Sequence, residues 1–217
     1  MKFHIITIFP EIFESYFNAS IVKRALEKRK IQIQTYGIRM YAKDKHKTVD
    51  NTPYGGGAGM VLIAEPILKT VASITRKKNK KRKIIIFSPK GKQFTQTYAN
   101  ILAKKYDELI FITGRYEGID ERVKTILKAE ELSIGPYVLT DGDVAAMVVV
   151  SAVTRLIPGV IKEASLSEES HTGNLGEYPQ YTKPETIIWK GKKYRVPKVL
   201  LSGNHKKIAE WRSEKSR

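Results

Sequence analysis

Cysteine is absent from this chain of 217 residues. Its absence excludes a disulfide framework and a thiolate metal site, and it fits a reducing compartment. Long hydrophobic runs are missing too, because the longest, residues 144–153, falls short of the ~20 apolar residues that span a bilayer. The amino terminus has a short apolar run without a small-residue cleavage site, so we expect no export signal. These absences predict a soluble, cytoplasmic protein with no membrane partner.

Acidic side chains are scarce relative to basic ones. The chain has 22 Asp and Glu against 39 Lys and Arg, a formal net charge of +17. Such a surplus suggests a polyanionic partner, most simply nucleic acid, because neutralised phosphates release counterions. A lysine-rich host proteome is the alternative, since bulk charge is a weak signal. The apolar share of 41% and the charged share of 28% indicate a globular chain.

Strand and helix patterns alternate along the first 160 residues. Strand, helix and strand within the first 36 residues predict a parallel βαβ unit, and hence an α/β fold. A helix at 142–156 is apolar almost all round, so it must be buried in a core or against a partner subunit. Apolar β-rich runs predict strands at 3–9, 31–36, 84–87 (stopped by residues 88–91), 109–112 and 131–134. Helical spacing predicts further helices at about 12–30, at 65–74 and at 120–128. One more helix is expected after residues 88–91, and it should end at about residue 105.

The character of the chain changes after Pro158 and Gly159. Residues 162–185 have no sustained apolar period, which is typical of a linker. Short extended pieces are expected around a turn at Gly191, followed by a basic helix at 204–212 that Ser202 or Asn204 caps. We therefore divide the chain into an α/β domain (1–161), an interdomain linker (162–180) and a small, mostly helical, basic domain (181–217).

Two glycine-containing loops, residues 113–122 and 133–143, follow predicted strands. Glycine lets backbone groups approach a small molecule closely, and parallel sheets bind ligands at the carboxyl ends of their strands. The two loops therefore predict a ligand pocket. No Gly-x-Gly-x-x-Gly follows a strand, which argues against a nucleotide-dependent dehydrogenase.

A third glycine cluster, residues 55–59, lies in a long segment without periodicity. Long loops in compact domains are usually functional. Apolar residues flank the glycines, so we favour a substrate-facing loop over a flexible spacer. No Lys-Ser or Lys-Thr follows the last glycine, which excludes a Walker loop.

These motifs resemble, in order and spacing, the bacterial tRNA (guanine-37-N1)-methyltransferase family (TrmD) of the SPOUT class. The resemblance implies a deep trefoil knot in the parallel-sheet domain, and methyl transfer from S-adenosylmethionine to N1 of guanosine 37 in tRNA. It also implies a homodimer whose sites combine the knot of one subunit with the C-terminal domain of the other. It runs through residues 7–10, 54–60, 88–91, 114–122, 133–139, 155–160, 181–184 and 197–205.

Three loops would hold the S-adenosylmethionine cofactor. Glu117 would favour the cationic sulfonium, although the residues alone suggest an ion pair with Arg115 or Arg122. Relatives usually have two glycines where this chain has Asp141 and Gly142, and they often have an acidic residue where this chain has Pro136. The Asp141 carboxylate could face the sulfonium. The implied cofactor-binding residues are Phe87, Ser88, Pro89, Gly114, Tyr116, Glu117, Gly118, Ser133, Ile134, Gly135, Pro136, Tyr137, Val138, Leu139, Asp141 and Gly142.

Guanine N1 becomes a nucleophile when a base removes its proton and a cation stabilises the charge on O6. The resemblance maps the base to Glu169, where many relatives have Asp, with Glu168 and Glu177 as alternatives. It maps the cation to Arg155, whose position is equally explained by the dipole at a helix C-terminus. We assign no metal-binding residue.

The substrate would be a tRNA with its target base flipped out of the stack, and not DNA. Asp50 would read that base, and the expected substrate contacts also include Gly55, Gly56, Gly57 and the phosphate-binding Lys206, Lys207 and Arg212. A basic RNA-binding or ribosome-assembly protein without catalysis is the alternative, and composition slightly favours it. The paired glycine loops and the linker carboxylates favour the enzyme, because a pure binder needs neither.

Overall fold

The computed structural model describes residues 1–162 and 178–216. The chain divides into two compact units, Met1–Ile161 and Lys162–Arg217. The predicted base Glu169 and its alternatives Glu168 and Glu177 lie outside the described residues.

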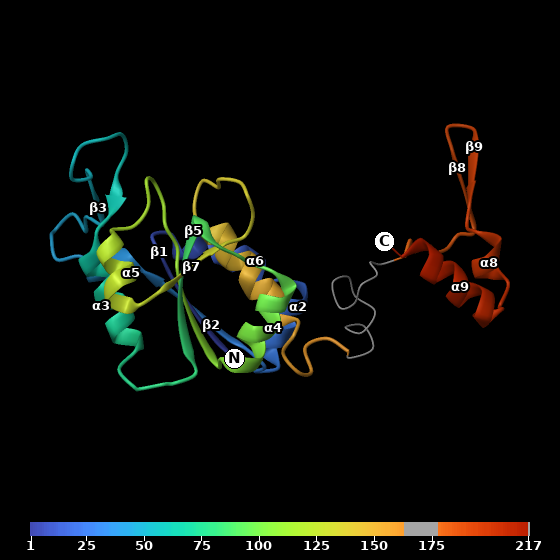
Figure 1. The fold of residues 1–217 in the computed structure, drawn as a ribbon, viewed down its shortest axis with the longest axis horizontal. Coiled ribbons are helices and arrows are strands. Elements are labelled where there is room, and N and C mark those ends of the chain that lie inside the picture. The colour runs from blue at the N-terminus through green and yellow to red at the C-terminus, as the bar shows by residue number, and fades with distance from the viewer. Residues whose placement is uncertain (163–177, 217) are drawn as a thin grey trace. The chain divides into compact units, whose positions relative to one another are not determined.

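A five-stranded sheet in the order β2-β1-β6-β5-β7 forms the centre of the larger unit (Figure 1). All neighbouring strands are parallel, which confirms the predicted α/β class. Side chains alternate between the two faces: on β1, Phe3 and Ile5 enter one core and Ile6 enters the other. The strands are β1 (Lys2–Thr7), β2 (Gln32–Gly37), β5 (Arg82–Gln93), β6 (Glu108–Ile112) and β7 (Glu130–Ser133).

Helices cover both faces of the sheet, so the middle strand β6 is buried at every residue (Figure 1). One face carries η1 (Pro10–Phe13), α1 (Glu14–Phe17), α2 (Ser20–Glu27), α4 (Gln96–Lys105) and α6 (Asp143–Thr154). The other carries η2 (Ile38–Tyr41), α3 (Ala64–Ile74) and α5 (Glu121–Leu127). The short strands β3 (Asp50–Asn51) and β4 (Val61–Leu62) pair on either side of the glycine cluster. Within the described ranges, no helix is long and apolar enough to cross a membrane.

Two local predictions were wrong. The single helix expected at 12–30 is broken, because Ala19 is extended (φ −119, ψ 148) between α1 and α2. Before the break, Phe13 and Phe17 stack at 5.6 Å between ring centroids and are both buried. The strand expected to stop before Ser88 continues as β5 to Gln93, because residues 88–91 form a bulge against β7.

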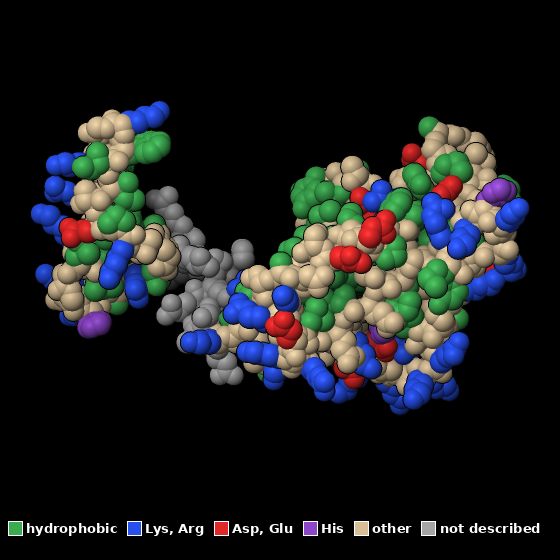
Figure 2. Space-filling view, turned by 180° about the vertical axis from the view of Figure 1, so that it is seen from behind, with side chains coloured by type: hydrophobic (Ala, Val, Ile, Leu, Met, Phe, Trp, Pro, Cys, Tyr) green, Lys and Arg blue, Asp and Glu red, His purple; other side chains and the backbone are tan. Residues whose placement is uncertain are grey.

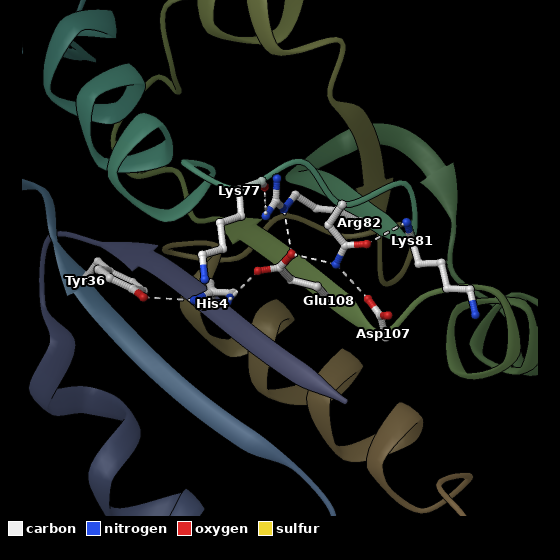
Figure 3. A network of polar contacts seen from close by, with 8 residues as sticks. His4, Tyr36, Lys77, Lys81, Arg82, Asp107 and Glu108 are labelled. Atoms are coloured by element: carbon white, nitrogen blue, oxygen red, sulfur yellow. Dashed lines mark hydrogen bonds and ion pairs between the residues drawn. The ribbon is translucent and has the colours of Figure 1, made fainter.

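A buried polar network holds the amino-terminal edge of the sheet (Figure 3). Glu108 accepts hydrogen bonds from Arg82 Nε at 2.7 Å and from Asn79 Nδ2 at 3.0 Å, and its other oxygen lies 3.1 Å from His4 Nε2. Burial lowers the pKa of His4, although the Glu108 carboxylate opposes the shift. A neutral His4 donates from Nε2 to Glu108 and accepts at Nδ1 from the Tyr36 hydroxyl, 2.9 Å away.

The smaller unit combines a β-hairpin with two helices. The hairpin pairs β8 (Thr186–Trp189) with β9 (Lys192–Arg195), and α8 (Lys198–Leu201) and α9 (His205–Lys215) follow. Asn204, one of the two predicted caps, accepts a hydrogen bond from the Lys207 N–H at 3.1 Å. None of residues 178–216 is fully buried, so this unit has little core of its own.

Candidate functional site

A cavity of about 290 Å³ lies beside the β5 bulge, where β6 and β7 end. The β5 bulge, the 114–121 loop and the 131–142 segment line it, so the two predicted glycine loops share one cavity. Every residue predicted to bind the cofactor lines it except Pro136: Phe87, Ser88, Pro89, Gly114, Tyr116, Glu117, Gly118, Ser133, Ile134, Gly135, Tyr137, Val138, Leu139, Asp141 and Gly142. The lining also includes Arg115, which the sequence offered only as an ion-pair partner of Glu117, and four residues that it did not single out: Asp120, Lys124, Glu131 and Thr140.

The walls of the cavity meet closely at Gly142. Its N–H donates to the Gly114 carbonyl at 2.9 Å. A Cβ atom at this position would lie 3.1 Å from Gly114 N and 3.2 Å from Thr113 Cα, closer than most side chains tolerate. Glycine is favoured here because backbone from two walls meets with little room for a side chain.

An ion cluster centred on Arg115 joins the same two walls. Arg115 Nη2 lies 3.2 Å from Asp141 Oδ2 and 3.4 Å from Asp143 Oδ2. Asp143 is fully buried and accepts a hydrogen bond from the Thr7 hydroxyl at 2.8 Å. The guanidinium also lies 4.6 Å from the ring centroid of Phe9. The cluster therefore connects both loops to the end of β1.

This cluster changes the interpretation of two predicted residues. Asp141 was expected to be able to face a bound cation, but its carboxylate already pairs with Arg115. Arg115 and Arg122 were the alternative partners of Glu117, yet Arg122 pairs with Asp120, with Nη2 and Oδ2 2.5 Å apart. Neither arginine therefore neutralises Glu117.

Glu117 is an exposed carboxylate of the 114–121 loop, which lines the cavity. In the part of the chain that the structure describes, its side chain makes no ion pair. Its N–H donates to the Met60 carbonyl at 3.0 Å, and the Leu62 N–H donates to the Gly118 carbonyl at 2.9 Å. The Glu117 carboxylate is thus available to a cation. The backbone hydrogen bonds attach the end of the glycine-rich segment to the 114–121 loop.

The 134–139 segment supplies an apolar wall. Ile134, Tyr137 and Leu139 line the cavity. Internal hydrogen bonds hold the turn: the Ser133 hydroxyl donates to the Gly135 carbonyl at 2.9 Å, and the Tyr137 hydroxyl donates to the Ile134 carbonyl at 3.3 Å. Such a wall, with backbone polar groups beside it, suits a flat heterocycle.

Other predicted site residues are not among those that line this cavity. Arg155 is the C-cap residue of α6 and is not part of the lining. Asp50 is on β3, and the exposed Gly55, Gly56 and Gly57 follow it; none of them lines the cavity. Lys206, Lys207 and Arg212 are exposed on α9 of the smaller unit, with the Arg212 guanidinium 4.6 Å from the Tyr178 ring centroid.

Comparison with known proteins relates the whole chain to one family. The family model described as tRNA (Guanine-1)-methyltransferase TrmD matches residues 1–217. A Thermomicrobium roseum protein is 53% identical over 98% of this chain and 77% of its own length. A Clostridioides difficile protein is 49% identical over 100% and 92%, and a Bacillus pumilus protein is 48% identical over 100% and 87%. Each carries the name tRNA (guanine-N(1)-)-methyltransferase.

Proposed function

The chain belongs to the tRNA (guanine-1)-methyltransferase TrmD family, and on that premise we propose that it transfers a methyl group from S-adenosylmethionine to N1 of guanosine 37 in tRNA. The cavity at the carboxyl edge of the sheet is the observation that carries this proposal. A purely RNA-binding protein would need neither a pocket of this kind nor a carboxylate available to a cation beside it.

The residues of the cavity fit S-adenosylmethionine. Ile134, Tyr137 and Leu139 would hold the adenine. The Glu117 carboxylate would attract the positive charge of the donor, because it makes no ion pair within the described ranges. When bound, the cofactor supplies an electrophilic methyl group on a sulfonium, so the protein needs to activate only the guanine.

Two side chains would activate guanine N1. The Glu169 carboxylate would accept the N1 proton, and Arg155 would stabilise the negative charge that builds on O6. Deprotonated N1 would be the nucleophile and Glu169 would hold the N1 proton, while S-adenosylmethionine would supply the methyl group and leave as S-adenosylhomocysteine. Asp50 and Gly55–Gly57 would contact the target base, and Lys206, Lys207 and Arg212 would bind tRNA phosphates.

A deep trefoil knot in the larger unit is part of the proposal. The 133–142 segment is hydrogen-bonded on two sides, from the Phe94 N–H to the Ser133 carbonyl at 2.7 Å and from the Gly142 N–H to the Gly114 carbonyl at 2.9 Å. It therefore lies between the chain that follows β5 and the chain that follows β6. This placement supports a path in which one segment is threaded through another.

A homodimer in the cytoplasm completes the proposal. Val144 and Val148 of α6 are 43% and 40% exposed, and their spacing of four residues places them on one side of the helix. This apolar strip supports an interface with a second copy of the chain, since most of the other residues of α6 are buried in its own unit.

The test uses the intact protein and unmodified tRNA. Calorimetry should detect binding of S-adenosylmethionine, and primer extension should stop at position 37 after incubation with both substrates. A tRNA with adenosine at position 37 should give no stop, because the 6-amino group of adenine cannot accept the hydrogen bond that Arg155 would donate to guanine O6. Absence of both cofactor binding and the stop would overturn the proposed function.

A further inference from the structure

The β8–β9 hairpin projects from the part of the smaller unit that holds α8 and α9 (Figure 1). Its two-residue turn, Lys190 and Gly191, has φ of 49° and 75°, as a type I′ turn requires. All but Thr186 of its eight strand residues are exposed. A two-stranded hairpin with both faces in water is at best marginally stable, so this one is suited to contact a partner.

Register separates the hairpin into two unlike faces. Ile187 lies opposite Tyr194, and Trp189 lies opposite Lys192. Because side chains alternate along a strand, these four share one face, with Lys192 Nζ 5.6 Å from the Tyr194 ring centroid. We call this the aromatic face. Trp189 is 65% and Tyr194 50% exposed, so both rings are available. The opposite face carries Thr186, Ile188, Lys193 and Arg195.

The charge of the hairpin indicates what covers the aromatic face. Residues 186–195 contain Lys190, Lys192, Lys193 and Arg195 and no acidic residue. Among the charged side chains on the visible surface of the smaller unit, Lys and Arg also prevail over Asp and Glu (Figure 2). Exposed aromatic rings among cations are the pattern that binds unpaired nucleic-acid bases, since every base offers a face for stacking and every nucleotide a phosphate. A protein partner would need a strongly acidic surface to match.

We propose that Trp189 and Tyr194 stack on unpaired bases of the substrate tRNA, while the hairpin cations bind the adjoining phosphates. This contact rests on the proposed function, and it adds a tRNA site beyond Lys206, Lys207 and Arg212. Rings two positions apart on paired strands lie about 7 Å from each other, a spacing that two neighbouring unstacked bases can match.

The first test is a direct spectroscopic readout that does not depend on activity. The chain has two tryptophans, so the Trp211→Phe variant leaves Trp189 as the sole indole. Titration with unmodified tRNA should change the Trp189 emission saturably, because stacking on a base alters the surroundings of the indole. Emission that stays constant while tRNA binds, as measured by filter binding, would overturn the proposal.

The second test compares matched variants in the otherwise intact chain. Trp189→Ala with Tyr194→Ala should weaken tRNA binding and raise the tRNA KM by about tenfold to a hundredfold. The kcat at saturating tRNA and the affinity for S-adenosylmethionine should stay at wild-type values. Trp189→Phe should keep most of the affinity. Ile188→Ala, an equally exposed change on the opposite face, should change it less than about twofold.

The salt dependence of the tRNA affinity distinguishes the contribution of ring stacking from that of ionic contacts with phosphates. Lys193→Gln with Arg195→Gln should reduce the slope of log affinity against log salt by about 0.7 for each phosphate that is no longer neutralised. Trp189→Ala should lower the affinity without changing that slope. If the aromatic double variant binds tRNA as the wild type does, or changes only the association state in sedimentation, the hairpin does not bind RNA. Failure of the proposed function is distinguishable, because it would abolish methyl transfer by the wild type itself.

Discussion

Replacing Arg115 by methionine tests whether the ion cluster holds the cavity together. Methionine retains much of the length and apolar volume of arginine but no charge. The change leaves Asp141 and the fully buried Asp143 without their cation. The Thr7 hydroxyl remains as a donor to Asp143, which is not enough for a buried carboxylate.

The expected loss follows from the burial of the partners. Removing one member of a buried ion pair costs about 3–5 kcal/mol. The Arg115 side chain is 25% exposed, so solvent already weakens its interactions, and we expect a loss of about 2–3 kcal/mol. A loss of that size is a substantial fraction of the roughly 5–15 kcal/mol that stabilises a typical domain.

Urea unfolding followed by circular dichroism measures the free energy of unfolding, and calorimetry measures the affinity for S-adenosylmethionine. Arg122→Met is the matched control, because Arg122 pairs with Asp120 but its side chain is 71% exposed. We expect Arg115→Met to lower both stability and cofactor affinity, and Arg122→Met to change either only slightly. Equal losses of stability in the two variants, or unchanged cofactor affinity in Arg115→Met, would refute the reasoning. Adding Asp141→Asn to Arg115→Met should recover part of the stability, because one unpaired charge is removed.

Three further predictions concern other carboxylates and a buried histidine. Glu169→Gln should reduce methyl transfer at least about a hundredfold while retaining S-adenosylmethionine binding, because only the proton acceptor is lost. Glu117→Gln should weaken S-adenosylmethionine binding about two- to fivefold in calorimetry, as expected for a partly solvated charge pair. The free energy of unfolding should fall as pH drops below about 6.5, because burial lowers the pKa of His4 in the folded state and the unfolded chain takes up the proton first.

Each of these has its own control. Glu168→Gln should retain activity, and if it is the inactive variant instead, the base has been assigned to the wrong residue. Glu117→Gln should bind S-adenosylhomocysteine, which lacks the positive charge, about as the wild type does; an equal loss for both ligands would exclude an electrostatic role. His4→Gln should reduce the fall in stability at low pH, and an unchanged pH profile would show that another group causes it.

Much of the fold was predictable from local pattern. Apolar runs alternating with helical periods indicated a parallel α/β sheet, and the sheet is parallel throughout. Glycine-containing loops after two strands indicated a pocket at the carboxyl edge, and both loops line one cavity. Assignment of that cavity to S-adenosylmethionine, and of Glu169 and Arg155 to catalysis, stays a prediction.

Long-range contacts were not predictable in this way. The bulge at residues 88–91 depends on the close approach of β7, where a Cβ atom on Gly91 would lie 2.5 Å from Leu132 N. The sequence offered Arg115 only as an alternative ion-pair partner of Glu117, its near neighbour in the chain, and gave no indication of Asp141 or Asp143.

The amino-acid sequence by itself determined the alternation of strands and helices, the basic charge and the positions of the glycine loops, because each depends on residues close together in the chain. Only the tertiary structure decided which charges are neutralised. It pairs Arg115 with Asp141 and Asp143 and leaves the Glu117 carboxylate at the cavity without an ion pair among the described residues. Ion pairs between distant segments depend on how the backbone packs, and local periodicity carries no information about that packing.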